Sequence, residues 1–272
     1  MLQKKQKDGE YDNLKLDYSI LISPYPLRLE KIGQIKSLTL GEIFSPSVTY
    51  SVYSSYLSFL FLTPDTYYEE IAKSKLNWYR SLSPDKKNEI TTFDLICNDV
   101  SLQNTYAKMF NLFFVEDVFW DNINQVFMVT QNKEGKNITV GVIHKNIFNE
   151  LCDIILQRCA ISRDSNYDNA TIKSKKVRSI LDKFKKGRRG RKPSKRNKSI
   201  EIPNLISSIA AKSKSINYTN IWQLTVYQLY DQFKREQEDV FLDVLKTSVA
   251  AYGNKDKRFK GNEWYTYPED VD

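Results

Sequence analysis

One strongly basic segment, residues 173–198, constrains what this chain can fold into. It holds 14 Lys or Arg residues and one acid, Asp182, whereas the rest of the 272-residue chain holds 27 basic and 32 acidic residues. Its second half, GRRGRKPSKRNK, contains two glycines and a proline, which interrupt a helix. A segment with so many like charges is expected to be exposed to solvent. The sequence therefore predicts two apolar, mildly acidic parts joined by an exposed basic linker.

The two apolar parts have enough hydrophobic residues to form a core. These residues make up 41% of the chain and aromatic residues 13%, which is typical of folded proteins. Glycine and proline are scarce, which disfavours a β-sandwich and a glycine-rich nucleotide loop. Three cysteines (Cys97, Cys152 and Cys159) and a polar N-terminus predict a reduced, intracellular protein.

Residues 38–160 are predicted to form a helical domain, after a segment 1–37 that is extended and partly disordered. The uncharged stretch 43–64 has the length of a membrane span, but its many serine, threonine, tyrosine and proline residues favour a buried helix. Its apolar residues at helical spacing are Val48, Val52, Tyr56, Phe59 and Leu60. Thr63-Pro64-Asp65 then predicts the start of a further helix.

The second half of this domain combines helices with a strand pattern. Residues 90–117 are predicted to be helical, with one apolar face formed by Leu102, Tyr106, Met109, Phe110 and Phe113. Two β-type runs around a connector that contains Gly135 predict a small hairpin near 126–142. Asn146 is expected to cap a helix over 147–159, whose buried face carries Phe148, Leu151, Cys152 and Ile155.

The chain beyond residue 160 is predicted to contain a basic linker, a second helical domain and a tail. The linker spans 161–200 and carries a short helix at 172–186, the domain spans 201–252, and the acidic, aromatic tail spans 253–272. The predicted fold class is mainly α with a small central β-hairpin (α+β), arranged as two helical lobes joined by the linker.

Three helices are expected in the second domain. Pro203 opens the first, and Thr225 caps the second, which carries Val226, Leu229, Tyr230 and Phe233 on one face. A separate final helix is expected over about 237–251, ended by Gly253.

The residues that could support catalysis fit structural roles better. His144 follows a strand without a partnered nucleophile, and the cysteines lie on apolar helix faces. The acid pairs Glu116/Asp117 and Glu238/Asp239 are interpreted as ordinary surface charges. The chain has no P-loop, GxGxxG or HExxH motif, and no close Cys/His pairs for zinc. The sequence thus predicts no catalytic residues, no cofactor, no metal and no enzyme activity.

The basic linker offers a possible nucleic-acid site. Arg189-Gly190-Arg191-Lys192-Pro193 resembles an AT-hook, whose glycine admits the backbone to a narrow minor groove while arginines reach its negative potential, although Lys192 interrupts the strict Arg-Gly-Arg-Pro core. The candidate residues are Arg188, Arg189, Gly190, Arg191, Lys192, Lys195 and Arg196. A solvated linker that docks on an acidic protein is the competing interpretation.

A partner surface is expected on the aromatic run from Trp222 to Phe233. Most of this run is predicted to be core, but Trp222 and Tyr227 fall off the main apolar stripe, and such aromatic residues carry much of the energy of interfaces. The candidate partner-binding residues are Trp222, Leu224, Tyr227, Tyr230 and Phe233.

Two segments resemble tail proteins of phages from low-GC bacteria. They are LISSIAAKSKSINYTNIWQLTVYQLYDQF (205–233) and IHKNIFNELCDIILQRCAIS (143–162), and the resemblance covers about residues 38–250. It implies a tail assembly chaperone or phage structural protein, with tape-measure or tail-tube protein as partner.

Several alternatives stay open beside the chaperone. One is a virion structural component of the neck, tail or baseplate, which would place the protein in the virion. Another is a DNA-binding accessory protein that uses the AT-hook-like segment. Self-association is a further expectation for the partners, and no membrane partner is expected.

Overall fold

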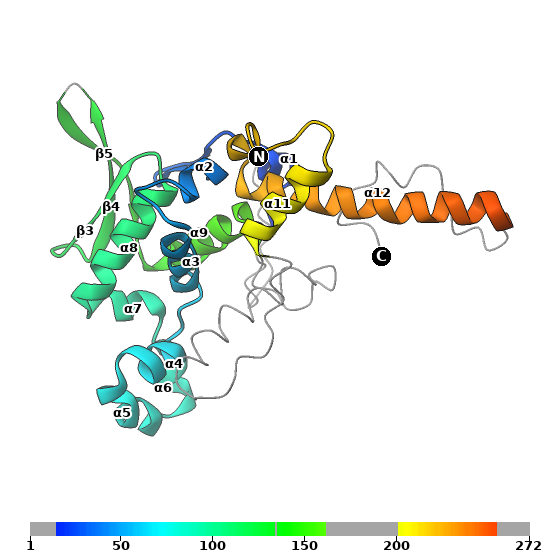
Figure 1. Cartoon of the computed structure of the whole chain (residues 1–272). Helices are drawn as coiled ribbons and strands as arrows, with labels where there is room; N and C mark the ends of the chain where they lie inside the picture. The colour runs from blue at the N-terminus through cyan, green and yellow to red at the C-terminus, as the bar shows by residue number, and fades with distance from the viewer. Residues whose placement is uncertain (1–14, 134, 162–200, 255–272) are drawn as a thin grey trace.

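The computed structural model describes residues 15–133, 135–161 and 201–254, and its fold is mainly helical with two small antiparallel sheets (Figure 1). This confirms the predicted α+β class. The first elements are α1 (Tyr18–Ile22), β1 (Leu27–Leu29), β2 (Gly33–Ile35), α2 (Leu40–Ile43) and α3 (Tyr50–Phe59). There follow α4 (Pro64–Thr66), the π-helix η1 (Tyr67–Ile71), the 3-10 helix η2 (Lys73–Lys75), α5 (Leu76–Ser81), α6 (Pro84–Glu89), α7 (Thr92–Cys97) and α8 (Val100–Phe113). The last are β3 (Asp117–Asp121), β4 (Val126–Lys133), β5 (Lys136–Ile143), α9 (Lys145–Arg158), α11 (Ile202–Lys212), the 3-10 helix η4 (Ile221–Gln223) and α12 (Val226–Tyr252).

The centre of the core is α8. Its predicted apolar face is buried along its whole length, at Leu102, Tyr106, Met109, Phe110 and Phe113. The ring of Phe127 on β4 lies edge-on to Phe110 at 5.1 Å between centroids, and Phe148 on α9 does so at 6.2 Å. Edge-to-face contacts of this kind add to the burial of apolar area. The sheet and α9 therefore both pack on α8.

The predicted hairpin is confirmed as β4 and β5, which belong to a three-stranded sheet with the order β3-β4-β5. The strand β3 was not expected, because its five residues, DVFWD, begin and end with an acid and lack a clear alternation.

The uncharged stretch 43–64 does not form the single helix that was predicted. It contains the end of α2, a loop, α3 and the start of α4, and Thr49 caps α3 by accepting a hydrogen bond from the backbone of Val52. The buried face of α3 carries Tyr53 and Leu57, whereas Val52 is 37% exposed. Of the predicted stripe, Leu60 is buried and Val48, Tyr56 and Phe59 pack partly buried against the core, so only Val52 departs from the prediction.

Thr63 caps the predicted helix at Pro64, which is confirmed as α4. Within the described ranges, no helix is long and apolar enough to cross a membrane.

Two other helix boundaries differ from the sequence prediction. The region 90–117 is divided into α7 and α8, because the Asp99 carboxylate accepts hydrogen bonds from the backbone of Ser101 and Leu102 and so begins a new helix. The N-cap of α9 is His144 rather than Asn146: the ring Nδ1 of His144 accepts a hydrogen bond from the Asn146 backbone at 3.3 Å. His144 is thus a capping residue.

The C-terminal helix α12 is one continuous helix of 27 residues. The prediction of two helices was wrong, because the charged run from Lys234 to Asp239 interrupts the apolar pattern but contains no residue that breaks a helix. The predicted cap at Thr225 is confirmed, with a full capping box to Gln228, and the helix ends before Gly253. The predicted start of a helix at Pro203 is confirmed by α11.

The base of α12 is fixed to the N-terminal part of the chain. Leu40 donates a backbone hydrogen bond to Leu224, and Val226 donates one to Leu38, at 2.8 and 2.9 Å. Buried residues of α11 and α12 belong to the same hydrophobic cluster as those of α8. Residues 162–200 of the predicted linker, with its helix 172–186, and the tail beyond 254 lie outside the described residues, and the domain boundaries remain a prediction.

Candidate protein-interaction surface

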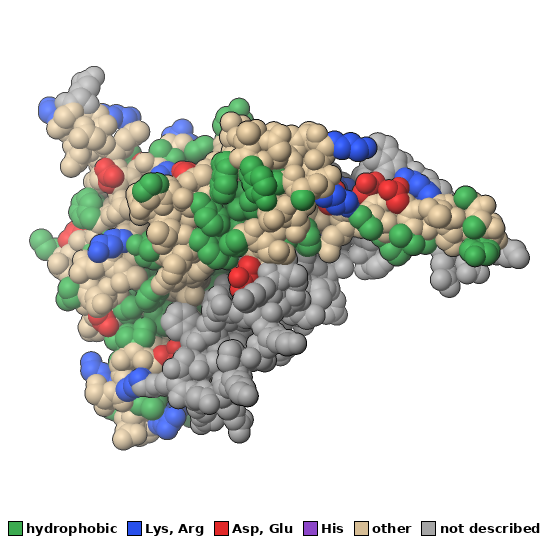
Figure 2. All heavy atoms as spheres, viewed as in Figure 1, with side chains coloured by type: hydrophobic (Ala, Val, Ile, Leu, Met, Phe, Trp, Pro, Cys, Tyr) green, Lys and Arg blue, Asp and Glu red, His purple; other side chains and the backbone are tan. Residues whose placement is uncertain are grey.

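A partly exposed group of aromatic side chains lies around Trp222. We call it the Trp222 patch and define it as Phe44, Tyr50, Tyr218 and Trp222. The Trp222 ring is 38% exposed and Tyr218 is 57% exposed. Phe44 lies edge-on to Trp222 at 5.9 Å between centroids and stacks on Tyr50 at 5.3 Å. Figure 2 shows hydrophobic side chains gathered over this part of the molecule, between α2 and α11.

The patch is held in place by its backbone. The indole Nε1 of Trp222 donates a hydrogen bond to the carbonyl of Tyr218 at 2.8 Å. Ile221, the first residue of η4, is buried in the core and fixes η4 there. A Cβ atom on Gly41 would lie 3.2 Å from the Trp222 carbonyl, so α2 packs closely under η4. Because these contacts already fix the ring, Trp222 loses little conformational entropy when a partner binds to it.

The other predicted partner-binding residues lie deeper. Leu224 and Phe233 are half-buried, whereas Tyr227 and Tyr230 are buried. Tyr227 packs edge-on to Tyr18 at 6.4 Å. The assignment of Tyr227 and Tyr230 to a partner surface is corrected here: α12 packs against both α1 and α11, so its base is covered on more than one face. Their rings stabilise the core.

The acid pairs also differ from the expectation of plain surface charges. Glu116 is buried, and its carboxylate accepts hydrogen bonds from the backbone and the side-chain amide of Gln34 at 2.9 and 3.2 Å. It thereby joins β2 to the start of β3. Glu238 is half-buried, and burial raises the pKa of its carboxyl. Asp117 and Asp239 are exposed, as predicted.

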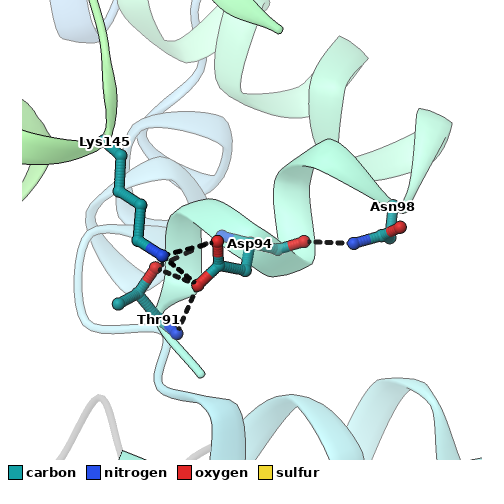
Figure 3. Close-up of polar contacts among 4 residues, drawn as sticks. All are labelled: Thr91, Asp94, Asn98 and Lys145. Carbon is teal, nitrogen blue, oxygen red and sulfur yellow. Dashed lines mark hydrogen bonds and ion pairs between the residues drawn. The ribbon is translucent and has the colours of Figure 1, made fainter. Parts of the chain in front are cut away.

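A concave surface lies between η1, α5 and α7, apart from the Trp222 patch. This cleft, of about 590 Å³, is lined mainly by aromatic and aliphatic side chains, with Lys75, Asp94 and Asn98 among the polar ones. Figure 3 shows how Asp94 is used: its carboxylate accepts hydrogen bonds from Thr91 and lies 2.7 Å from the Lys145 ammonium. Asp94 therefore caps α7 and pairs with α9.

We expect Asp94→Asn to lower stability by about 0.5–1 kcal/mol at pH 7 and to have a smaller effect at pH 3. Partial burial alone would raise the pKa of Asp94, but the hydrogen bonds from Lys145 and Thr91 outweigh it and lower the pKa. A lowered carboxyl pKa stabilises the fold above the unfolded value, about pH 4, and this contribution is lost as pH falls through the folded value. Urea denaturation at both pH values measures this. Equal losses of stability at pH 7 and pH 3 would show that the charge of Asp94 does not stabilise the fold. Lys145→Met removes the ion pair and keeps the hydrogen bonds from Thr91.

The described residues contain no group of three or more His, Cys, Asp or Glu side chains arranged to hold a metal ion. The candidate nucleic-acid residues, Arg188, Arg189, Gly190, Arg191, Lys192, Lys195 and Arg196, lie outside the described residues. DNA binding therefore remains a prediction from the sequence.

Sequence reasoning found Trp222 but missed the residues that complete its patch. Phe44 and Tyr50 are more than 170 positions away in the chain, and no local pattern links them to Trp222. The capping residue Thr39 was the available signal, because a capped helix start at 39–40 places Phe44 at the end of α2.

Together the fold and the patch describe a mainly helical α+β protein with an exposed aromatic surface at the base of its last helix. Residues 194–267 match the family model of the YomV second domain, a phage-associated family. The match includes α11, η4 and all of α12, and hence Trp222 and Tyr218. No curated protein and no solved structure matches the chain.

Proposed function

We propose that this protein is a non-enzymatic phage morphogenesis protein that binds another phage protein through the Trp222 patch. The observation that carries the proposal is the partly exposed indole of Trp222, held by backbone contacts beside Phe44 and Tyr218. Aromatic side chains fixed in this way are frequent energetic centres of protein interfaces. The phage-associated family match over the same helices supports a phage setting.

The finer proposal is a tail assembly chaperone whose partner is the tape-measure or tail-tube protein. A tape-measure protein presents apolar helix faces until the tube encloses them, and an aromatic surface covers such faces by burying apolar area. This role places the protein in the host bacterial cytoplasm during assembly. It needs no catalytic residue, cofactor or metal.

The test is co-purification of Trp222→Ala with tail proteins from infected cells. We expect the affinity for the partner to fall about 30-fold, since loss of a central aromatic residue costs about 2 kcal/mol. Thermal stability should change little, because the ring is already partly in water. Trp78→Ala is the matched control: Trp78 is 52% exposed and lines the other cleft.

Two results would count against the proposal. Retained binding by Trp222→Ala, with loss in Trp78→Ala, would move the interaction surface to the cleft between η1, α5 and α7. Abundant peptides of this protein in purified particles would favour the virion component of the neck, tail or baseplate over a chaperone that leaves before maturation.

A further inference from the structure

The cleft between η1, α5 and α7 is a second place where an aromatic ring is exposed. Its volume of about 590 Å³ lies within the range of roughly 300–1,000 Å³ that is typical of small-molecule sites. The ring that it exposes is the indole of Trp78, which is 52% exposed, whereas Tyr67 and Tyr68 are buried. The cleft shares no residue with the Trp222 patch, so it is a separate candidate site.

Neighbouring rings hold Trp78 in position. Tyr68 lies edge-on to Trp78 at 5.7 Å between centroids and stacks on Tyr79 at 4.4 Å. Tyr67 lies edge-on to Tyr68, and its hydroxyl donates a hydrogen bond to the Asp99 carboxylate at 2.7 Å. Tyr67 and Tyr68 belong to the π-helix η1, and turns of the π type are frequent at functional sites. A flat ligand that stacks on Trp78 therefore meets a ring that is already oriented.

The charges that line the cleft favour an anionic ligand over a cationic one. The carboxylate of Asp94 is already paired, because the Lys145 ammonium lies 2.7 Å from it. The side chain of Lys75 is exposed at the edge of the cleft, and the two acids of η1 are not among the residues that line it. Lys75 lies three residues before Trp78, a spacing that brings two Cβ atoms within about 5–6 Å of each other on a helix. One ammonium group thus lies beside the exposed ring.

The α7 side of the cleft adds a hydrogen-bond acceptor. The amide nitrogen of Asn98 donates to the Asp94 carbonyl at 2.8 Å, and the amide oxygen points away from Asp94 (Figure 3). A side-chain amide oxygen accepts hydrogen bonds from amino groups such as the N6 group of adenine. The cleft therefore combines a flat aromatic surface, a cation and an acceptor.

We propose that this cleft binds a planar aromatic ring that carries an anionic group, as a nucleotide does. The base stacks on Trp78, the phosphate lies beside Lys75, and Asn98 accepts a hydrogen bond from the base. Both a free nucleotide and a nucleotide within a single strand present this chemistry, and stacking on an aromatic side chain tolerates every base. The site does not depend on the protein partner proposed for the Trp222 patch.

The first test is isothermal titration calorimetry of the full chain with adenosine 5′-monophosphate (AMP). Trp78→Ala should weaken AMP binding about tenfold or more, as expected for the loss of one stacked base, whereas Trp78→Phe keeps a ring and should retain most of the affinity. Trp222→Ala is the matched control, because it removes a partly exposed indole from the other surface and should leave AMP binding unchanged. Thermal unfolding of each variant shows whether the fold is kept.

The second test isolates the charge and leaves the aromatic rings intact. Lys75→Met should lower the affinity for AMP to that for adenosine, which lacks the phosphate, and should leave adenosine binding unchanged. Lys73→Met removes an exposed ammonium that does not line the cleft, and it should have no effect. The basic segment 173–198 is present in every variant, so it cannot cause a difference between them.

The third test identifies the source of the nucleotide with a single-stranded tetranucleotide of deoxyadenylate. Binding tighter than that of AMP, and dependent on Trp78, would assign the site to a single strand, whereas binding no tighter than that of AMP would assign it to a free nucleotide. The proposal is overturned by the absence of AMP binding at millimolar concentration, by equal affinities for AMP and adenosine, or by equal losses in Trp78→Ala and Trp222→Ala. None of these results bears on the phage protein that Trp222 is proposed to bind, so the two proposals can fail separately.

Discussion

Replacement of Arg158 by leucine should destabilise the protein by about 3–5 kcal/mol, because several buried acceptors lose their donor together. Arg158 ends α9 and is only 3% exposed. Its guanidinium donates to the carbonyl of Ile20 at 3.1 Å, to that of Tyr25 at 2.7 Å, and to the hydroxyl of Ser37. Each acceptor left without a partner costs about 1–3 kcal/mol when water cannot replace the donor.

Urea denaturation of Arg158→Leu measures this loss, and hydrogen exchange locates it. We expect faster amide exchange in α1 and in the segment that leads to β1, since the guanidinium bonds α9 to the carbonyl groups of Ile20 and Tyr25 in this part of the chain. Arg80→Leu, which removes an exposed guanidinium, serves as the control and should change stability by less than about 0.5 kcal/mol. A loss below 1 kcal/mol in Arg158→Leu would mean that water enters and satisfies the carbonyl groups.

Arg158 also illustrates which parts of the fold local patterns could not predict. The face of α8, the hairpin β4-β5 and the cap at Thr225 were predictable, because their signals repeat within a few residues. The acceptors of Arg158 lie more than 120 positions away. A basic residue at the end of a helix normally favours the surface, and only the packing of the N-terminal segment over it reverses that expectation.

The candidate surface was predictable to a similar extent. Trp222 was found because it lies off the apolar stripe of its run, and it is partly exposed. Tyr227 also lies off this stripe, but it is buried. The criterion fails for Tyr227 because a helical pattern shows only that a residue lies away from one face, and not whether a second element covers it. The element that covers this face of α12 is α1. It is joined to α12 by the Tyr18 hydroxyl, which donates a hydrogen bond to the Asp231 carboxylate at 2.9 Å.

The two sheets meet at another contact between distant parts of the chain, and it gives the second large expected effect. Gly141 on β5 faces the turn between β1 and β2, where a Cβ atom would lie 2.5 Å from the carbonyl oxygen of Ile32 and 2.6 Å from its Cα. The turn cannot move away freely, since the Val142 backbone donates to the Lys31 carbonyl at 3.1 Å and Lys31 already has a φ of 59°. The overlap is with backbone atoms, so no rotamer change relieves it.

Gly141→Ala should therefore cost about 3 kcal/mol, which is large for the addition of one methyl group. Gly135→Ala provides the comparison. Gly135 lies in the turn of the β4-β5 hairpin with a φ of +78°, and no atom lies within 4 Å of an added Cβ. The alanine variant therefore loses only the free energy of placing a non-glycine residue in the left-handed conformation, about 1 kcal/mol. Denaturation of both variants by urea separates steric overlap from backbone strain. If Gly141→Ala loses no more stability than Gly135→Ala, the turn yields to the methyl group, and the close approach of the two sheets is not what requires glycine at this position.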